Sequence, residues 1–236
     1  MAPAAFLPRD MQIFTNLLGA DPAFLRIVAL SLEVSLAGTA IAAVIGLPIG
    51  AALASCRFPG RRLLILGASA LLGLPPVVAG LMLYLLLSRS GPLGGLGLLF
   101  TPAAMVAAQA LLALPIVAAL THRGMEGVWA EFGPALQMDG AGPLRAIPSL
   151  LAIGRGQVLA ALLAGFGRTI SEVGAILIVG GNIAGLTRTM TTDIALQTSM
   201  GNLGLALRLG LVLIAISVSV NAAVFALERG PWKGKP

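Results

Sequence analysis

Long apolar stretches separated by short polar ones run along most of the chain. A transmembrane helix needs about 20 predominantly apolar residues, and several stretches reach that length: 27–55, 63–87, 102–120, 157–180 and 209–227. A further stretch, 9–20, is too short to span a bilayer, and we expect an amphipathic helix at the membrane surface there. The pattern predicts an all-α integral membrane protein with about five transmembrane helices.

Two of these stretches contain residues that alter a helix. Gly46 and Gly50 form a small-xxx-small pattern in the first stretch, and Pro75-Pro76 breaks the second. We interpret both features as packing devices. The alternative is that a broken helix lines a transport path.

The composition supports the membrane assignment. The chain is 58% hydrophobic and 10% charged, with a mean hydropathy of +0.98, whereas soluble domains are about 25% charged. The net charge of +6 comes from only 15 Lys and Arg. These residues lie mostly at span ends, where they set topology, so nucleic acid is not an expected partner. We expect a multi-pass protein of the plasma (inner) membrane.

The basic residues predict the orientation of the chain. Nine of them flank one side of the spans and five flank the other. The larger set is Arg57, Arg61, Arg62, Arg123, Arg145, Arg155, Arg229, Lys233 and Lys235; the smaller is Arg9, Arg26, Arg89, Arg188 and Arg208. Because basic loops stay in the cytoplasm, the N-terminal segment 1–26 is predicted outside. A transmembrane domain 27–227 follows, with its polar loop 121–156 and the tail 228–236 in the cytoplasm.

The polar loop has the outline of two short helices meeting at residues 140–143. Gly140 and Ala141 would let the backbones approach closely, and Pro143 suits the first turn of the second helix. In that helix Leu144, Ile147 and Leu151 recur at helical spacing, which predicts an apolar face able to dock on a partner.

Catalytic chemistry has little support in the sequence. His122 is the only histidine, the single Cys56 has no partner, and no phosphate-binding G-x-x-x-x-G-K-[ST] loop occurs. A membrane enzyme would need clustered His or carboxylates, so we do not expect an enzyme or a metal site. If ATP drives this protein, a separate subunit must hydrolyse it.

Two ionisable residues lie within the fourth stretch. Arg168 and Glu172 are spaced i, i+4, so they are expected to share a helix face and partly neutralise each other. Ionisable residues in a membrane are costly and often functional. The pair could be a structural ion pair or part of a transport pathway, and the sequence does not decide between them.

A polar segment, 180–193, follows that stretch on the predicted outer side. It combines glycines with several donors for an oxyanion that loses water: Asn182, Thr187, Arg188, Thr189, Thr191 and Thr192. The alternative interpretation is a polar external loop that caps the helix bundle.

The loop 121–156 resembles the coupling loop of ABC importer permeases. Ala135 matches the first alanine of the family's Glu-Ala-Ala motif, Gly140 its glycine, and Leu150-Leu151 its apolar end. Pro134 and Leu136 stand where the motif has Glu and its second Ala. No proline follows Leu151.

Longer segments resemble the permease subunit of tungstate ABC importers, within the molybdate/sulfate/tungstate permease group. They are G-F-G-R-T-I-S-E-V-G-A-I-L-I-V-G-G-N-I at 165–183, T-R-T-M-T-T at 187–192, L-P-P-V-V-A-G-L at 74–81 and S-R-S-G-P-L-G at 88–94. The resemblance runs from about residue 24 to 227. It implies a type I ABC importer transmembrane domain that acts as a homodimer.

The resemblance also implies partners and roles. A cytoplasmic ATP-binding subunit would carry ATP and Mg, an extracytoplasmic protein would bind the oxyanion, and this chain would bind no cofactor. The ATPase would be coupled through Ala135, Gly140, Ala141, Leu144, Ile147, Leu150 and Leu151. The substrate pathway would include Arg168, Ser171, Glu172, Asn182, Thr187, Arg188, Thr189, Thr191 and Thr192. Tungstate is the expected substrate, with molybdate or sulfate as alternatives. A secondary transporter or channel without an ATPase is the competing class.

Overall fold

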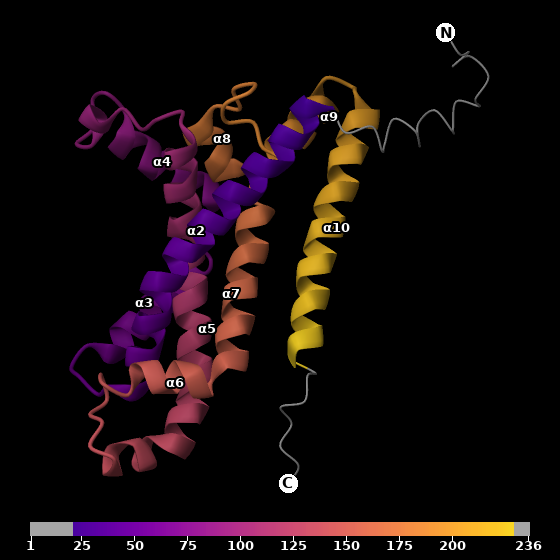
Figure 1. Cartoon of the computed structure of the whole chain (residues 1–236). Coiled ribbons are helices and arrows are strands. Elements are labelled where there is room, and N and C mark those ends of the chain that lie inside the picture. The colour runs from indigo at the N-terminus through magenta and orange to yellow at the C-terminus, as the bar shows by residue number, and fades with distance from the viewer. Residues whose placement is uncertain (1–20, 229–236) are drawn as a thin grey trace.

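The structure, a computed structural model, describes residues 21–228, and its regular elements there are all helical (Figure 1). The amphipathic helix expected at 9–20 lies outside these residues, as does most of the expected tail. The elements in chain order are α2 (Pro22–Ser55), α3 (Arg61–Leu71), α4 (Pro76–Leu87), the 3₁₀ turn η1 (Gly94–Leu96), α5 (Pro102–Met138), α6 (Ile147–Ile153), α7 (Arg155–Ile170), α8 (Gly174–Gly180), α9 (Met190–Ser199) and α10 (Leu203–Glu228).

The chain passes repeatedly between two ends of an elongated bundle. In Figure 1, α2, α5 and α10 run down the view, whereas α3 with α4, and then α7, run up it. Three described helices, α2, α5 and α10, are long and apolar enough to cross a membrane alone. Two bent pairs raise the number of candidate spans to five: α3 with α4, at 104°, and α6 with α7, at 86°. The predicted all-α membrane fold is confirmed.

The centre of the bundle is the close packing of α2 against α5. A Cβ added to Gly50 of α2 would lie 2.6 Å from the carbonyl oxygen of Ala118 in α5, so only glycine allows this approach. One turn earlier, Gly46 faces Val117 in the same way. The small-xxx-small pattern is therefore a packing device, as predicted. Helix α7 joins this centre, because Gly165 also packs on Val117.

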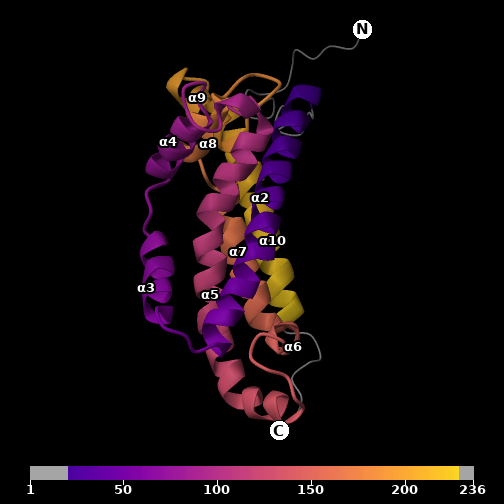
Figure 2. The same cartoon turned by 90° about the vertical axis from the view of Figure 1, so that its left-hand side faces the viewer.

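The predicted break at Pro75-Pro76 is confirmed. Helix α3 ends at Leu71, and α4 begins at Pro76, where a proline needs no hydrogen-bonded N–H. Figure 2 shows α3 and α4 along one side of the bundle. No side chain of α3 is buried.

The prediction of a polar loop beginning at residue 121 is wrong, because α5 continues to Met138. The extension buries several side chains that recur at helical spacing and so share one face of the helix: Thr121, His122, Met125 and Val128. Packing of this face maintains the helix where its other side is polar.

The prediction of one helix over 157–180 is also wrong. Helix α7 ends at Ile170, and α8 begins at Gly174. The second helix expected from Pro143 begins instead at Ile147, so Leu144 lies in the turn before it.

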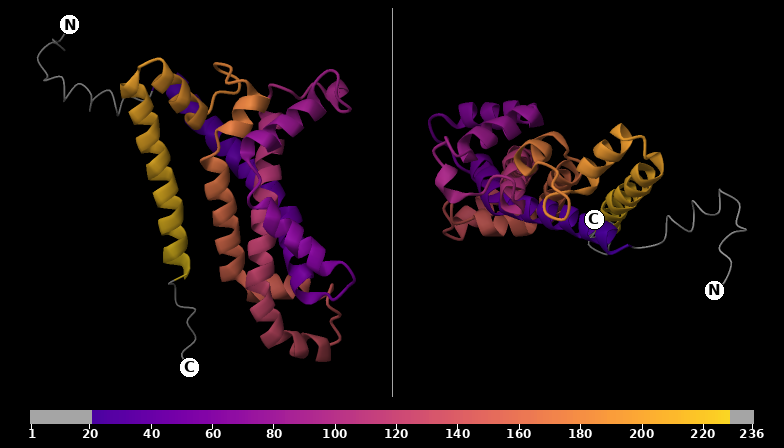
Figure 3. Two further views of the ribbon diagram at one scale, coloured as in Figure 1. Left: turned by 180° about the vertical axis from the view of Figure 1, so that it is seen from behind. Right: turned by 90° about the horizontal axis from the view of Figure 1, so that it is seen from above.

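Helix α10 joins the bundle mainly through its first half. Leu209 is buried with Phe166 and Ile170 of α7 and with Met190 of α9. Further along α10, Ile216 and Val220 remain partly buried against the same cluster, although Figure 3 shows the ribbon of α10 set apart from that of α7. Its exposed stripe is apolar, as expected for a surface that faces lipid or another subunit: Leu207, Leu211, Ile214 and Val218.

Candidate functional site

Arg168 and Glu172 form an ion pair across the end of α7. Arg168 lies in the last turn of α7, and Glu172 lies in the connection between α7 and α8. Arg168 Nη2 is 3.1 Å from Glu172 Oε2, and the side chains are 34% and 3% exposed, respectively. The expected pairing is therefore present, but Glu172 lies beyond the helix end and not on a shared helix face.

The buried Glu172 connects three helices. Its Oε1 accepts a hydrogen bond from the backbone N–H of Ala175, in the first turn of α8, at 3.0 Å. Its backbone carbonyl accepts a hydrogen bond from Thr191 Oγ1 of α9, at 2.8 Å. A carboxylate at a helix N-terminus is favourable because the first amides lack partners within the helix. Glu172 thus holds α7, α8 and α9 together.

The threonines of 187–192 are also buried and bonded within the chain. Thr187 Oγ1 donates to the carbonyl of Gly180 at 2.6 Å, and Thr192 Oγ1 accepts from the backbone N–H of Thr189 at 3.0 Å. The exposed fraction of all four threonines is 8% or less. In this conformation their hydroxyl groups stabilise the connections between α8 and α9, which matches the alternative of a polar segment capping the bundle.

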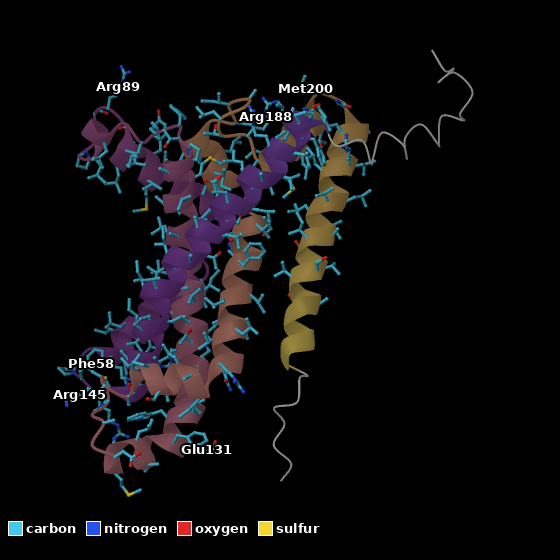
Figure 4. The ribbon with its side chains drawn as sticks, viewed as in Figure 1. Phe58, Arg89, Glu131, Arg145, Arg188 and Met200 are labelled. Atoms are coloured by element: carbon cyan, nitrogen blue, oxygen red, sulfur yellow. The ribbon has the colours of Figure 1, made fainter. Side chains whose placement is uncertain are left out.

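Arg188 and Asn182 lie together in the connection between α8 and α9. Arg188 Nη2 donates to the carbonyl of Asn182 at 3.4 Å, and its Nε lies 3.8 Å from Asp193 Oδ1. Arg188 remains 24% exposed, and Figure 4 places it at the same end of the molecule as Arg89 and Met200. Ser171 is exposed, and its hydroxyl donates only to carbonyls of its own helix turn.

A buried polar layer that the sequence interpretation missed lies beside Arg168. Gln109 of α5 donates from Nε2 to the carbonyl of Thr169 at 2.8 Å, and Thr39 of α2 lies 3.1 Å from Thr169 through their Oγ1 atoms. Gln109 Oε1 is buried without a partner among the described residues. The layer connects α2, α5 and α7 at the end of α7. The sequence signal for this layer is Gln109, an uncharged amide within the apolar stretch 102–120.

At the opposite end, α6 packs on the end of the bundle. Leu150 is fully buried against Ala51 of α2 and Met125 of α5, and Ile147 and Leu151 pack against the same cluster. The predicted free face of Leu144, Ile147 and Leu151 is therefore wrong, because two of its members contact their own chain. The exposed side of this region is formed by Leu144, Arg145, Pro148 and Ser149.

Gly140 ends α5 in a left-handed conformation, with φ of 81°. The N–H groups of Gly140 and Ala141 donate to the carbonyls of Gln137 and Leu136, which closes the helix as a Schellman motif. A Cβ added to Gly140 would meet nothing within 4 Å. The expected close approach of backbones is wrong, and the positive φ is the reason for glycine. Ala135 is exposed and Ala141 is half-buried.

Known proteins resemble the chain over most of its length, although no protein-family model matches it. It is 40% identical over 209 residues to the tungstate uptake system permease protein TupB of Peptoclostridium acidaminophilum, covering 89% of this chain and 92% of that protein. It is 37% identical over 172 residues to TupB of Campylobacter jejuni, covering 73% and 72%. It is 30% identical over 227 residues to the molybdenum transport system permease protein ModB of Escherichia coli K12, covering 89% and 97%.

Proposed function

The chain belongs to the ABC-transporter permeases that include the tungstate and molybdenum uptake proteins, and from this premise we propose that it forms the membrane pathway of an ATP-driven tungstate importer. The observation that carries the proposal is the 40% identity with a tungstate permease over 89% of the chain. Molybdate is the second candidate substrate, because molybdenum permeases match at 30% identity over a similar length.

The partners would be an ATP-binding subunit and an extracytoplasmic binding protein, each contacting one end of a homodimer. The end with α6 suits the ATPase because exposed residues gather there on a short helix and the turn before it, and the helix is anchored to the bundle by Leu150: Leu144 and Arg145 in the turn, and Pro148 and Ser149 on α6. A cytoplasmic location of this end is supported by the arginines that the chain carries there: Arg57, Arg61, Arg62, Arg123, Arg145 and Arg155. The other end would face the binding protein.

Movement of α6 would reach the pathway through packed side chains. Leu150 of α6 contacts the ends of α2 and α5. Further along, the same two helices hold the end of α7 through Thr39, Gln109 and Thr169. A push on α6 would therefore change how α2 and α5 support the residues around Arg168, and the outer side would open by alternating access.

The anion would pass close to Arg168, whose guanidinium is the partly exposed member of its pair. A doubly charged oxyanion loses much hydration energy within a membrane, so a cation that is already neutralised could attract it without holding it too firmly. In the conformation described here the threonines are occupied with internal hydrogen bonds. Their contribution to the pathway would require the segment 180–193 to rearrange.

The test is uptake into proteoliposomes that contain this chain and its ATPase, with the binding protein outside. Tungstate, molybdate and sulfate would be compared at equal concentrations, and an ATPase that binds but does not hydrolyse ATP would be the control. We expect tungstate accumulation that needs both the binding protein and hydrolysis. Accumulation by this chain alone would contradict the proposal and favour a secondary transporter or channel.

A further inference from the structure

The turn between α2 and α3 carries an unusual concentration of cations. Arg57, Arg61 and Arg62 line an open pocket of about 540 Å³ together with Phe58, Gly60 and Leu63. Figure 4 places Phe58 at the same end of the molecule as Arg145 and Glu131. This pocket has no place in the proposed transport pathway, which lies at the other end of α7.

The three arginines differ in what they contact. Arg61 is fixed, because its Nε donates to the carbonyl of Leu53 and its Nη2 lies 3.1 Å from Glu126 Oε1. Arg57 and Arg62 are exposed, and no carboxylate within residues 21–228 lies at ion-pair distance from either of them. The pocket therefore has two cations that form no ion pair with a carboxylate of the described residues, although Arg57 also lines a neighbouring pocket with Glu126.

Apolar side chains adjoin these cations on the outer surface. Phe58 is 40% exposed, and Leu63 and Leu66 are 73% and 65% exposed. Helix α3 buries none of its side chains although most of them are apolar, as expected of a helix whose surroundings are hydrocarbon. The cations thus lie at the level where a lipid-facing surface ends and a polar turn begins.

We propose that Arg57 and Arg62 bind the phosphate of an anionic phospholipid, with Phe58 and Leu63 against the upper part of its acyl chains. Basic pockets at the membrane surface attract anionic head groups. Guanidinium groups bind phosphate through directed, charge-assisted hydrogen bonds. The first turn of α3 has no side-chain cap, and although the Arg61 N–H donates to the carbonyl of Phe58, the amides of Arg62 and Leu63 can add to the binding. Gly60 has φ of 88°, and an added Cβ would meet nothing within 4 Å, which leaves the pocket open beside the backbone.

An acidic segment of the ATPase is the competing occupant, and the lipid is favoured by the exposed apolar residues. A soluble partner would leave Leu63 and Leu66 uncovered, whereas a phospholipid supplies both a phosphate and the hydrocarbon that these residues need. The site is independent of the transported anion.

The test uses the purified full-length chain in detergent, with bound lipid counted by native mass spectrometry. Dioleoyl phosphatidylglycerol, dioleoyl phosphatidylcholine and inorganic phosphate are the probes. The variant is Arg57→Gln with Arg62→Gln, and the matched control is Arg26→Gln with Arg89→Gln, which also removes two exposed arginines. A variant with lysine at positions 57 and 62 retains the charge. Co-purification of the ATPase is measured in parallel.

We expect the wild type to prefer phosphatidylglycerol, and the preference to weaken about fivefold for each arginine removed at the site. The control should keep the preference, the lysine variant should keep part of it, and inorganic phosphate should compete only weakly. If the glutamine variant does not fold, loss of the wild-type preference at high salt tests the same electrostatic binding. Equal binding of both lipids by the wild type would overturn the proposal, as would equal loss in both variants. Loss of ATPase co-purification with lipid preference intact would assign these arginines to the ATPase.

Discussion

Arg168 and Glu172 can be replaced one at a time and then together. The comparison distinguishes a structural ion pair from a residue that serves the transport pathway. Arg168→Gln leaves the Glu172 carboxylate, which is 3% exposed, with Ala175 N–H as its remaining partner. Breaking a fully buried pair costs about 3–5 kcal/mol. Because Arg168 is 34% exposed and water can replace part of its contact, we expect a destabilisation of about 2 kcal/mol.

Glu172→Gln should cost less than Arg168→Gln. The partly exposed Arg168 stays solvated, and a glutamine oxygen can still accept from Ala175 N–H as a neutral hydrogen bond. A loss of about 1 kcal/mol is expected, the difference between a charged and a neutral acceptor. In the double variant no buried charge is left unpaired, so it should lose less than the sum of the two, with a coupling of roughly 1–2 kcal/mol.

The assay is thermal unfolding of the purified chain, combined with tungstate uptake by the reconstituted transporter. Arg89→Gln, an exposed arginine at the same end, is the control and should change neither quantity. If Arg168 serves the pathway, the double variant recovers stability but not uptake, and Glu172→Gln slows uptake because an unpaired Arg168 retains the anion. A coupling energy near zero would refute the structural reasoning. Normal uptake by a stable Arg168→Gln protein would exclude Arg168 from the pathway.

Three further outcomes follow from the geometry. Gly140→Ala should weaken ATPase co-purification about fivefold, because an alanine in the left-handed conformation costs about 1 kcal/mol or more. Gly142→Ala is the control and should not weaken it. Equal effects of the two variants would contradict the role of the positive φ at Gly140. Gln109→Leu should lower the stability by about 1 kcal/mol, because the Thr169 carbonyl loses its side-chain donor and keeps only backbone donors such as the Glu172 N–H. An unchanged melting temperature would contradict this. In a protein without its native cysteine, a cysteine at position 89 should label from outside and one at 131 only after permeabilisation; labelling from the same side would contradict the predicted orientation.

The sequence predicted the fold where the bilayer itself restricts the structure. A chain in hydrocarbon must satisfy its backbone hydrogen bonds internally, so long apolar stretches imply helices. Pro75 and Pro76 imply a break for an equally local reason, because proline lacks the N–H that continues a helix. Gly46 and Gly50 were likewise interpretable, since small residues four apart let two membrane helices meet.

The extension of α5 could not be predicted from polarity alone. Residues 121–138 contain charged side chains, glycines and Pro134, all typical of loops. Which of them would be buried depends on packing against α2, which is distant in the sequence, and against α6, and this tertiary packing overrides local propensity. For the same reason the helical spacing of Ile147 and Leu151 predicts a free apolar face, whereas both residues pack against Ala51, Met125 and their neighbours.

The break between α7 and α8, on which the candidate site depends, cannot be predicted from the apolar pattern. Residues on both sides of the break are apolar enough to continue one helix, and no proline separates them. The continuous helix would place Glu172 beside Arg168 but leave its carboxylate with that single partner. With the helix interrupted, the same carboxylate also accepts the Ala175 N–H, and its backbone carbonyl accepts from Thr191. Since a buried charge needs several hydrogen bonds, the break and the ion pair depend on each other. Replacing Arg168 should therefore also weaken the hydrogen bonds of Glu172 at the start of α8 and α9. These bonds help to hold the segment 180–193 in place.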